Sequence, residues 1–132
     1  DWGRLAAAYK RFYKTELPSE HYDLAWHRLR AGDLVHAFGA RLDGRLVGIT
    51  HYLFHTTVWT GDSCYLQDLY VDESVRGGGV GKALIEQVAA AARQRGATRL
   101  HWTTQHDNAR ARRLYDQIAE HRGFIRYDLP MA

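Results

Sequence analysis

The segment that decides the fold is YLQDLYVDESVRGGGVGKALIE, residues 65–86. It begins with a run of β-forming residues, passes through the glycine-rich loop RGGGVGK at residues 76–82, and continues into a helical pattern from Val80. Amides in the first turn of a helix have no intrahelical acceptor, and the helix dipole favours negative charge at that end. Glycines remove the side chains that would keep a ligand away from this backbone. The order strand, glycine loop, helix therefore indicates a site for an anion such as a phosphate.

Two well-known phosphate-binding loops do not fit this segment. A Walker A loop needs a glycine five positions before its GK pair and Ser or Thr after the lysine, where this chain has Arg76 and Ala83. The dinucleotide-binding fingerprint needs a third glycine, which Lys82 or Leu84 displaces, depending on the register. The sequence thus supports neither ATP hydrolysis nor NAD binding. For the loop taken alone, a surface turn without a ligand is the alternative.

The composition indicates one soluble domain. The chain has 132 residues, 45% of them hydrophobic, which suits a single modest core. Its net charge of +3, from 18 basic and 15 acidic residues, is too small for a nucleic-acid-binding surface, so we expect no nucleic-acid partner. The single cysteine, Cys64, allows no intramolecular disulfide and favours a reducing compartment. Because no long apolar run occurs, we expect a cytoplasmic protein with no membrane association.

The remaining sequence predicts helices and strands on both sides of the glycine loop. We expect helices around residues 5–13 and 22–31, a helix from Val80 that stops at Gly96, and a helix that Asn108 caps. The strands are expected at residues 34–42, 46–59, 64–71, 99–105 and 123–130, the first two joined by a tight turn at 43–45. This order predicts an α/β (α+β) fold with a mixed sheet. The sequence opens within a helical pattern with no leading strand, as in a chain that begins inside a longer natural sequence.

Two motifs resemble those of one enzyme family. Arg76, Gly79 and Gly81 spell R-x-x-G-x-G before a hydrophobic helix, and residues 108–124, NARARRLYDQIAEHRGF, contain the pattern N-x-x-A-x-x-L-Y followed by G-F. Both motifs, in this order, resemble those of the GNAT N-acetyltransferase superfamily over about residues 34–127. The nearest branch is that of the polyamine and small histone/polyamine acetyltransferases, whose strand commonly reads L-E-D-L-Y-V.

The resemblance implies a fold and an activity. Residues 1–132 would form one N-acetyltransferase domain of the GNAT fold, with the sheet splayed between the strands at 64–71 and 99–105. Acetyl-CoA would be the co-substrate, and a primary amine of a small molecule, a polyamine or a lysine side chain would attack it directly in a ternary complex. We also expect a homodimer and no metal. The alternative from another class is a non-catalytic acyl-CoA-binding regulatory protein of the same fold.

The resemblance also implies roles for individual residues. The main chain of the strand would pair with the pantetheine arm, and the loop amides would hold the pyrophosphate. Tyr115 would protonate the departing thiolate. Asn108 would hydrogen-bond the pantetheine region. The implied cofactor-binding residues are therefore Leu69, Tyr70, Val71, Arg76, Gly77, Gly78, Gly79, Val80, Gly81, Lys82 and Asn108.

The chain departs from the family pattern at two points. Gln67 stands where the polyamine branch has glutamate, and a neutral amide cannot accept a proton from the amine. Asp68 is the next carboxylate, but strand alternation sends it to the opposite face unless a bulge intervenes. Three candidate bases follow: Asp68, a chain of water molecules, or bulk solvent acting on an amine that is already neutral. The stretch at residues 116–122 is longer than the family spacing, and we expect it to add a helical turn.

Other residue types give weaker signals. Eight histidines raise the possibility of a metal, but no H-E-x-x-H motif and no Cys/His cluster with ligand spacing occurs. His51 and His55 share a strand face and form at most a weak ligand pair. Cys64 is expected to be a small buried strand residue rather than a nucleophile. The early helices and the strand around residues 50–59 contain few acids, which fits a strongly cationic polyamine poorly.

Overall fold

The computed structural model describes all residues 1–132, which form two compact units at residues 1–102 and 103–132. The first unit contains helices α1 (Trp2–Phe12), α2 (Ser19–Ala31) and α3 (Val80–Gln94), a short 3₁₀ helix η1 (Glu73–Val75), and strands β1 (Val35–Leu42), β2 (Arg45–His55), β3 (Ser63–Val71) and β4 (Arg99–His101). The second unit contains helix α4 (Ala109–Ile118).

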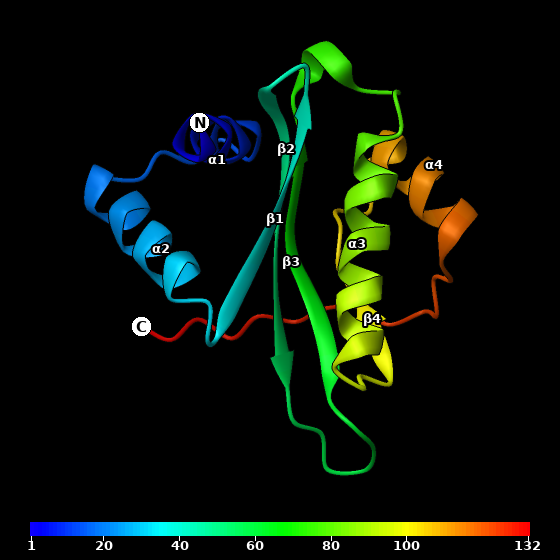
Figure 1. Cartoon of the computed structure of the whole chain (residues 1–132). Coiled ribbons are helices and arrows are strands. Elements are labelled where there is room, and N and C mark those ends of the chain that lie inside the picture. The colour runs from blue at the N-terminus through cyan, green and yellow to red at the C-terminus, as the bar shows by residue number, and fades with distance from the viewer. The chain divides into compact units, whose positions relative to one another are not determined.

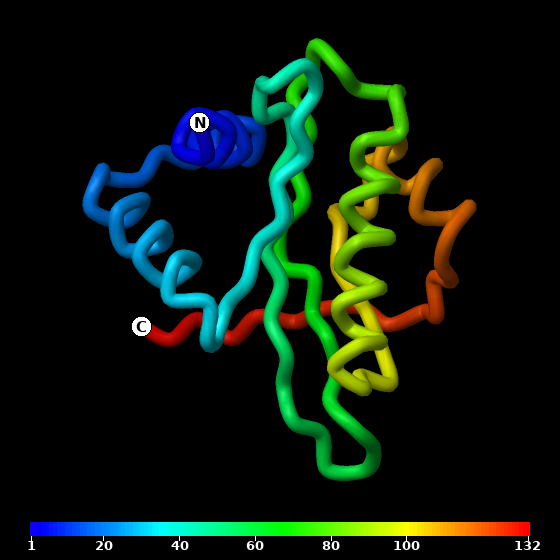
Figure 2. Tube along the Cα trace, viewed as in Figure 1, coloured from blue at the N-terminus to red at the C-terminus, as the bar shows by residue number.

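The first unit is built on a mixed four-stranded sheet, as the sequence predicts. The strand order is β1-β2-β3-β4, with the first three strands antiparallel and β4 parallel to β3 (Figures 1 and 2). The β1–β2 hairpin turns at Asp43 and Gly44, which both have positive φ angles of 51° and 80°. This is the two-residue turn whose twist matches that of the flanking strands.

Helices cover both faces of this sheet. In Figure 1, α1 and α2 lie on one side of the β1–β3 strands and α3 lies on the other. The buried residues Leu5 and Ala6 of α1 pack with Leu46 and Ile49 of β2. On the other face, α3 buries one stripe of its surface, formed by Leu84, Ile85, Val88 and Ala92. The amphipathic pattern of α3 therefore predicts its buried face correctly.

The N-terminal turn of α3 approaches β2 closely at Gly48. A Cβ atom at this position would lie 2.9 Å from Cγ1 of Val80 and 3.0 Å from Cδ1 of Leu84. A side chain on Gly48 would therefore require Val80 and Leu84 to shift. The absence of a side chain at Gly48 thus allows the first turn of α3, just after the glycine loop, to lie close to β2.

A β-bulge at Gln67 changes which face of the sheet the next residues occupy. His51 pairs with Asp68 and Tyr52 pairs with Leu66, so Gln67 has no partner on β2. Without this extra residue, Asp68 would share the α3 face with Leu66. With the bulge, Asp68 lies on the face that α1 covers.

Three expected elements end earlier than predicted, and a fourth is absent. β2 ends at His55 rather than at residue 59. Just after its end, the Thr57 hydroxyl donates to the Thr60 carbonyl at 2.7 Å and closes a turn. β4 spans three residues instead of residues 99–105, because its pairing with β3 ends at Tyr65, just before the bulge. α4 ends at Ile118, so residues 119–122 add no helical turn, and residues 123–130 form no strand. An alternating pattern makes a strand only where its backbone groups find a partner. None of the helices has the length and apolar character needed to span a membrane.

Candidate active site

The glycine loop presents a row of backbone amides at the N-terminus of α3. Gly77 and Gly79 have φ angles of +88° and +86°, and Gly79 occupies the N-cap position without a side-chain cap. The first amide that bonds back along the helix is that of Ala83, which donates to the Gly79 carbonyl at 3.0 Å. The amides of Val80, Gly81 and Lys82 therefore have no intrahelical acceptor. These three N–H groups and the helix dipole form an anion site.

Two loop amides that the resemblance assigns to the pyrophosphate already have partners. The Arg76 amide donates to the Glu73 carbonyl and the Gly78 amide donates to the Val75 carbonyl, each at 3.4 Å. The glycines around them are exposed, and a Cβ atom added at Gly77 or Gly79 would meet no atom of the protein within 4 Å. The space above the loop is therefore open to a ligand.

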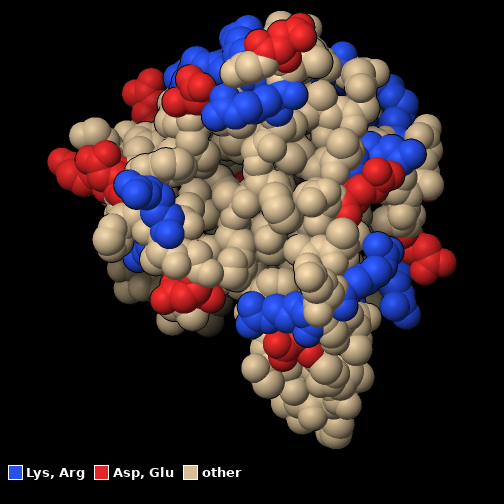
Figure 3. Space-filling model, in the orientation of Figure 1, with Lys and Arg blue, Asp and Glu red and all other residues tan.

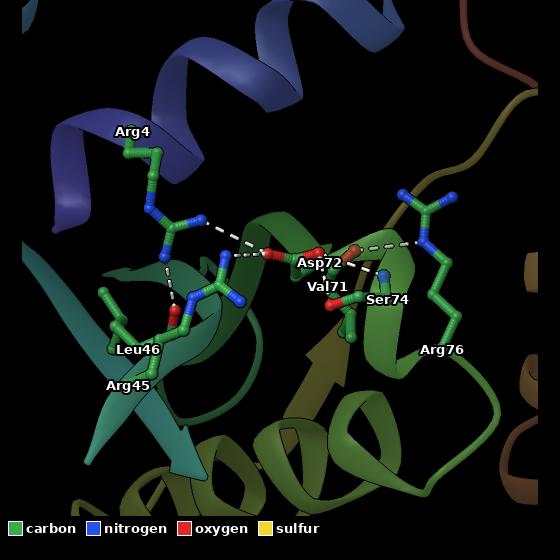
Figure 4. Close-up of polar contacts among 7 residues, drawn as sticks. All are labelled: Arg4, Arg45, Leu46, Val71, Asp72, Ser74 and Arg76. Atoms are coloured by element: carbon green, nitrogen blue, oxygen red, sulfur yellow. Dashed lines mark hydrogen bonds and ion pairs between the residues drawn. The ribbon is translucent and has the colours of Figure 1, made fainter. Parts of the chain in front are cut away.

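Asp72 fixes the chain where β3 passes into the loop (Figure 4). Its Oδ1 atom accepts from the amide of Ser74 at 3.0 Å and from the hydroxyl of the same residue at 2.9 Å. Its Oδ2 atom pairs with Arg4 at 3.2 Å and with Arg45 at 3.3 Å. The Ser74 amide, the Ser74 hydroxyl and the two arginines hold the pKa of Asp72 below its ordinary value. Asp72 thereby ties α1, β2 and the start of the loop together.

The Arg76 side chain lies against the sheet and α1. Its Nε atom donates to the Val71 carbonyl at 3.0 Å, as Figure 4 shows. Its guanidinium group lies over the rings of Tyr70 and Phe12, with distances of 5.3 and 5.8 Å to the ring centroids. Arg76 thus orders the loop entrance through its side chain.

The edge of β3 on the β4 side has unpaired backbone groups beyond Tyr65. The amide of Asp72 donates to the Val47 carbonyl at 2.8 Å, which makes these two residues a hydrogen-bonded pair. Antiparallel pairs alternate, so Tyr70 also bonds toward β2, while Leu69 and Val71 direct their N–H and C=O groups to the other edge. Because β4 pairs only with residues 63–65, no strand covers this edge at residues 66–71. Leu69 and the Val71 amide can therefore pair with an extended ligand, whereas the Val71 carbonyl already accepts from Nε of Arg76 and the main chain of Tyr70 bonds toward β2.

Asp68 lies in a polar cluster on the α1 face. Its Oδ2 atom lies 2.9 Å from Nδ1 of His51, and Nε2 of that histidine accepts from the indole N–H of Trp2 at 2.9 Å. Burial raises the pKa of Tyr9 far above its ordinary value, and the charge of the neighbouring Asp68 carboxylate raises it further. Gln67, by contrast, is exposed. The bulge therefore places the Asp68 carboxylate on the face that α1 covers. The neutral Gln67 amide could not act as a base.

The second unit holds the other two predicted site residues on one helix. Asn108 caps α4, as expected, because its Oδ1 atom accepts from the Ala111 amide at 3.3 Å. Tyr115 lies half-buried on the same helix, seven residues later and so on the same side of it. The structure thus groups the loop residues and Asp68 in the first unit and places Asn108 and Tyr115 together in the second.

The sequence did not predict that Trp2 and His51 form a chain of hydrogen bonds with Asp68. The only signal for His51 is its place on the strand face shared with His55, and Trp2 lies 49 residues away from its partner. His55 has a different contact, from its Nδ1 atom to the Thr56 carbonyl at 3.1 Å. No cluster of three or more His, Cys, Asp or Glu side chains is arranged to hold a metal ion.

Charged side chains of both signs are mixed on the visible surface. In the view of Figure 3, lysines and arginines alternate with acidic residues around the margin, and the centre is mostly uncharged. This face has no continuous basic stripe of the kind that follows a nucleic-acid backbone.

Comparison with known proteins gives the site its context. A family described as "Acetyltransferase (GNAT) family" matches residues 2–119. The D-amino-acid N-acetyltransferase HPA3 of Saccharomyces cerevisiae is 37% identical over 123 residues, which cover 89% of this chain and 76% of that protein. The thialysine N-epsilon-acetyltransferase of Bos taurus is 37% identical over 73 residues, 55% of this chain and 43% of that protein.

A solved structure agrees with these sequence matches. The ribosomal-protein-alanine N-acetyltransferase from Brucella melitensis biovar Abortus 2308 superposes with a TM-score of 0.78 at 29% identity, covering 97% of this chain and 89% of that one. The expected fold class, a mixed sheet flanked by helices, is confirmed by this likeness. With the family match over residues 2–119, it follows that the chain belongs to the GNAT family of acetyltransferases.

Proposed function

We propose that the protein moves the acetyl group of acetyl-CoA to a primary amine by direct attack, without a covalent enzyme intermediate. The chain belongs to a family of acetyltransferases and its relatives are named N-acetyltransferases, which supports acetyl transfer to an amine. The observation that carries the proposal is the row of amides at Val80, Gly81 and Lys82, with exposed glycines before it. These donors suit the negative charge of a pyrophosphate.

The first unit fits the rest of acetyl-CoA as well. The outward-facing N–H and C=O groups of Leu69 and the N–H group of Val71 suit the amides of a pantetheine arm, which can pair with a strand edge. Asn108 would add a contact to the same arm. Acetyl-CoA supplies an activated acetyl thioester, and we propose that no metal takes part.

Two residues carry the proton transfers of this reaction, Asp68 as the base and Tyr115 as the acid. An alkylammonium has a pKa of about 10.4, so its first proton must leave to solvent before the nitrogen can attack. When the new C–N bond forms and the C–S bond breaks, Asp68 takes the second proton from nitrogen and Tyr115 donates one to sulfur. Solvent then exchanges the proton between these residues. The overall reaction gives an N-acetylated amine, the thiol of CoA and one released proton.

The charge distribution favours an acceptor with a single positive charge. α1, β2 and β3 contain only one carboxylate among them, that of Asp68. A polyamine with several ammonium groups would find one partner there. The names of the relatives, a D-amino-acid and a thialysine acetyltransferase, support small amino compounds as the substrate class.

An acceptor screen tests this function. We expect release of CoA thiol from acetyl-CoA with at least one member of a panel of amino acids, monoamines, polyamines, aminoglycosides and lysine peptides. Monoamines and amino acids should react faster than polyamines. Tight binding of acetyl-CoA with no thiol release for any amine would favour the alternative, a non-catalytic acyl-CoA-binding protein.

Two broader features belong to the same proposal. We propose that the protein acts in the cytoplasm, where acetyl-CoA and reduced thiols occur together. We also propose a homodimer, which light scattering on the purified protein would test. A single species with the mass of one chain at micromolar concentration would contradict the dimer.

A further inference from the structure

The two ring nitrogens of His51 face two different partners. Nε2 lies 2.9 Å from the indole nitrogen of Trp2, and Nδ1 lies 2.9 Å from Oδ2 of Asp68. An indole N–H can only donate, so Nε2 must accept. The imidazole proton therefore lies on Nδ1, where it donates to the carboxylate. A second proton on Nε2 would set two N–H groups against each other.

The elements around this chain of hydrogen bonds hold it in place. Trp2 stacks on Trp26 of α2, with ring centroids 5.3 Å apart and an interplanar angle of 30°. The bulge at Gln67 sets Asp68 directly opposite His51 on the neighbouring strand. The side chains of His51 and Asp68 are only 16% and 20% exposed. The pair is thus mostly shielded from water, which strengthens the hydrogen bond between them.

Tyr9 provides a second proton donor beside the carboxylate. Burial and the charge of Asp68 keep its pKa far above the ordinary value, so the hydroxyl stays protonated throughout the neutral range. The Asp68 carboxylate thus accepts from the N–H of His51 and has the Tyr9 hydroxyl as a neighbour. Contacts with both side chains restrict the rotation of the carboxylate.

We propose that His51 is a positioning residue that holds the Asp68 carboxylate for the acceptor amine, and that Trp2 fixes the tautomer which makes this possible. The inference rests on the function proposed above, in which Asp68 takes a proton from the attacking nitrogen. α1, which contributes Trp2, would then also set the orientation of the base. A purely structural pair that only ties α1 to the sheet would have no such effect on turnover.

The tautomer can be measured without any substrate. In protein labelled with ¹⁵N-histidine, the side-chain signals of His51 are assigned by their loss in His51→Asn. We expect a protonated Nδ1 and an unprotonated Nε2 near neutral pH, and in Trp2→Phe a mixture of the two tautomers. An Nε2-protonated ring in the wild type would overturn the inference.

Kinetics separate positioning from a structural role. His51→Leu removes the donor, and we expect kcat to fall roughly 10- to 100-fold while the Kd for acetyl-CoA changes less than about twofold. His51→Asn keeps an N–H near the Nδ1 position and should recover most of this loss. His55→Asn, on the same strand face, is the matched control and should behave as the wild type.

The outcomes distinguish the inference from the proposed function. An active wild type whose kcat is unchanged in His51→Leu would refute the positioning role and leave the function standing. Equal losses in His51→Leu and His51→Asn, with equal losses of thermal stability, would also refute it. A wild type that acetylates no amine would refute the function, whereas the tautomer measurement would still decide whether Trp2 sets the state of the imidazole.

Discussion

Replacing Gly79 with valine tests the glycine loop most sharply. The residue has a φ angle of +86°, a region where a residue with a side chain costs about 1–3 kcal/mol of stability. A Cβ atom there would meet no atom of the protein within 4 Å, so the unliganded loop has room for the first atom of a side chain. We expect the valine to take up space that the ligand needs above the helix amides. We expect the Kd for acetyl-CoA to rise at least about tenfold, or about 1.4 kcal/mol.

Gly96 provides the matched control for this experiment. It lies just beyond the other end of α3, has a φ angle of +83°, and likewise has no atom within 4 Å of an added Cβ. Gly96→Val should therefore lower the melting temperature about as much as Gly79→Val and leave the affinity for acetyl-CoA unchanged.

Isothermal titration calorimetry with acetyl-CoA measures both variants, and thermal unfolding confirms that each is folded at the temperature of the titration. An unchanged Kd in folded Gly79→Val would remove the loop from the binding site. Equal losses of affinity in Gly79→Val and Gly96→Val would show that strain in α3, rather than lost space for the ligand, causes the effect.

Further predictions concern the acid, the base, Asp72 and Cys64. Tyr115→Phe should lower kcat by roughly 100-fold or more with little change in cofactor affinity, and near wild-type turnover at saturating substrates would exclude it as the acid. In the wild type, log(kcat/KM) should rise from about pH 7 to about 9 with ionisation of the amine. Asp68→Asn should lose roughly 100-fold in kcat, and full activity of this variant would leave solvent as the base. The pKa of Asp72 is lowered in the folded protein, so its stabilising effect is present above its ordinary value of 3.8 and lost as the pH falls through the folded value. The melting-temperature difference between wild type and Asp72→Asn should accordingly vanish in strong acid, and a difference that persists there would exclude this linkage. Burial raises the pKa of the Cys64 thiol to about 11, so it should react with thiol reagents only after unfolding, and rapid labelling of the native protein would contradict this.

Local patterns in the sequence predict most of the helices and strands. The helical spacing of Leu84, Ile85 and Val88 identifies the buried face of α3, and Asn108 marks the start of α4. The Asp43–Gly44 pair marks the turn of the first hairpin. These features depend on neighbours within a few residues, which is why a single sequence reveals them.

The features that depend on distant partners are not predictable in this way. The bulge at Gln67 is defined only by the pairing of β3 with β2, and strand alternation alone would place Asp68 on the wrong face. The hydrogen bond from Trp2 to His51 joins residues 49 positions apart. The short β4 reflects a loss of pairing beyond Tyr65, although its sequence continues with β-forming residues. In each case tertiary pairing overrides local preference.

The most direct test of the central proposal follows the acetyl group itself. The protein is mixed with acetyl-CoA labelled with ¹³C in the acetyl group and with the best amine of the acceptor screen. Mass spectrometry then measures the masses of all products and of the protein. We predict that the label appears on the amine in equal amount to the CoA thiol released, and that acetyl-CoA alone leaves no label on the protein. Thiol release without a labelled amine, or an acetylated protein that passes its label to the amine, would contradict direct transfer.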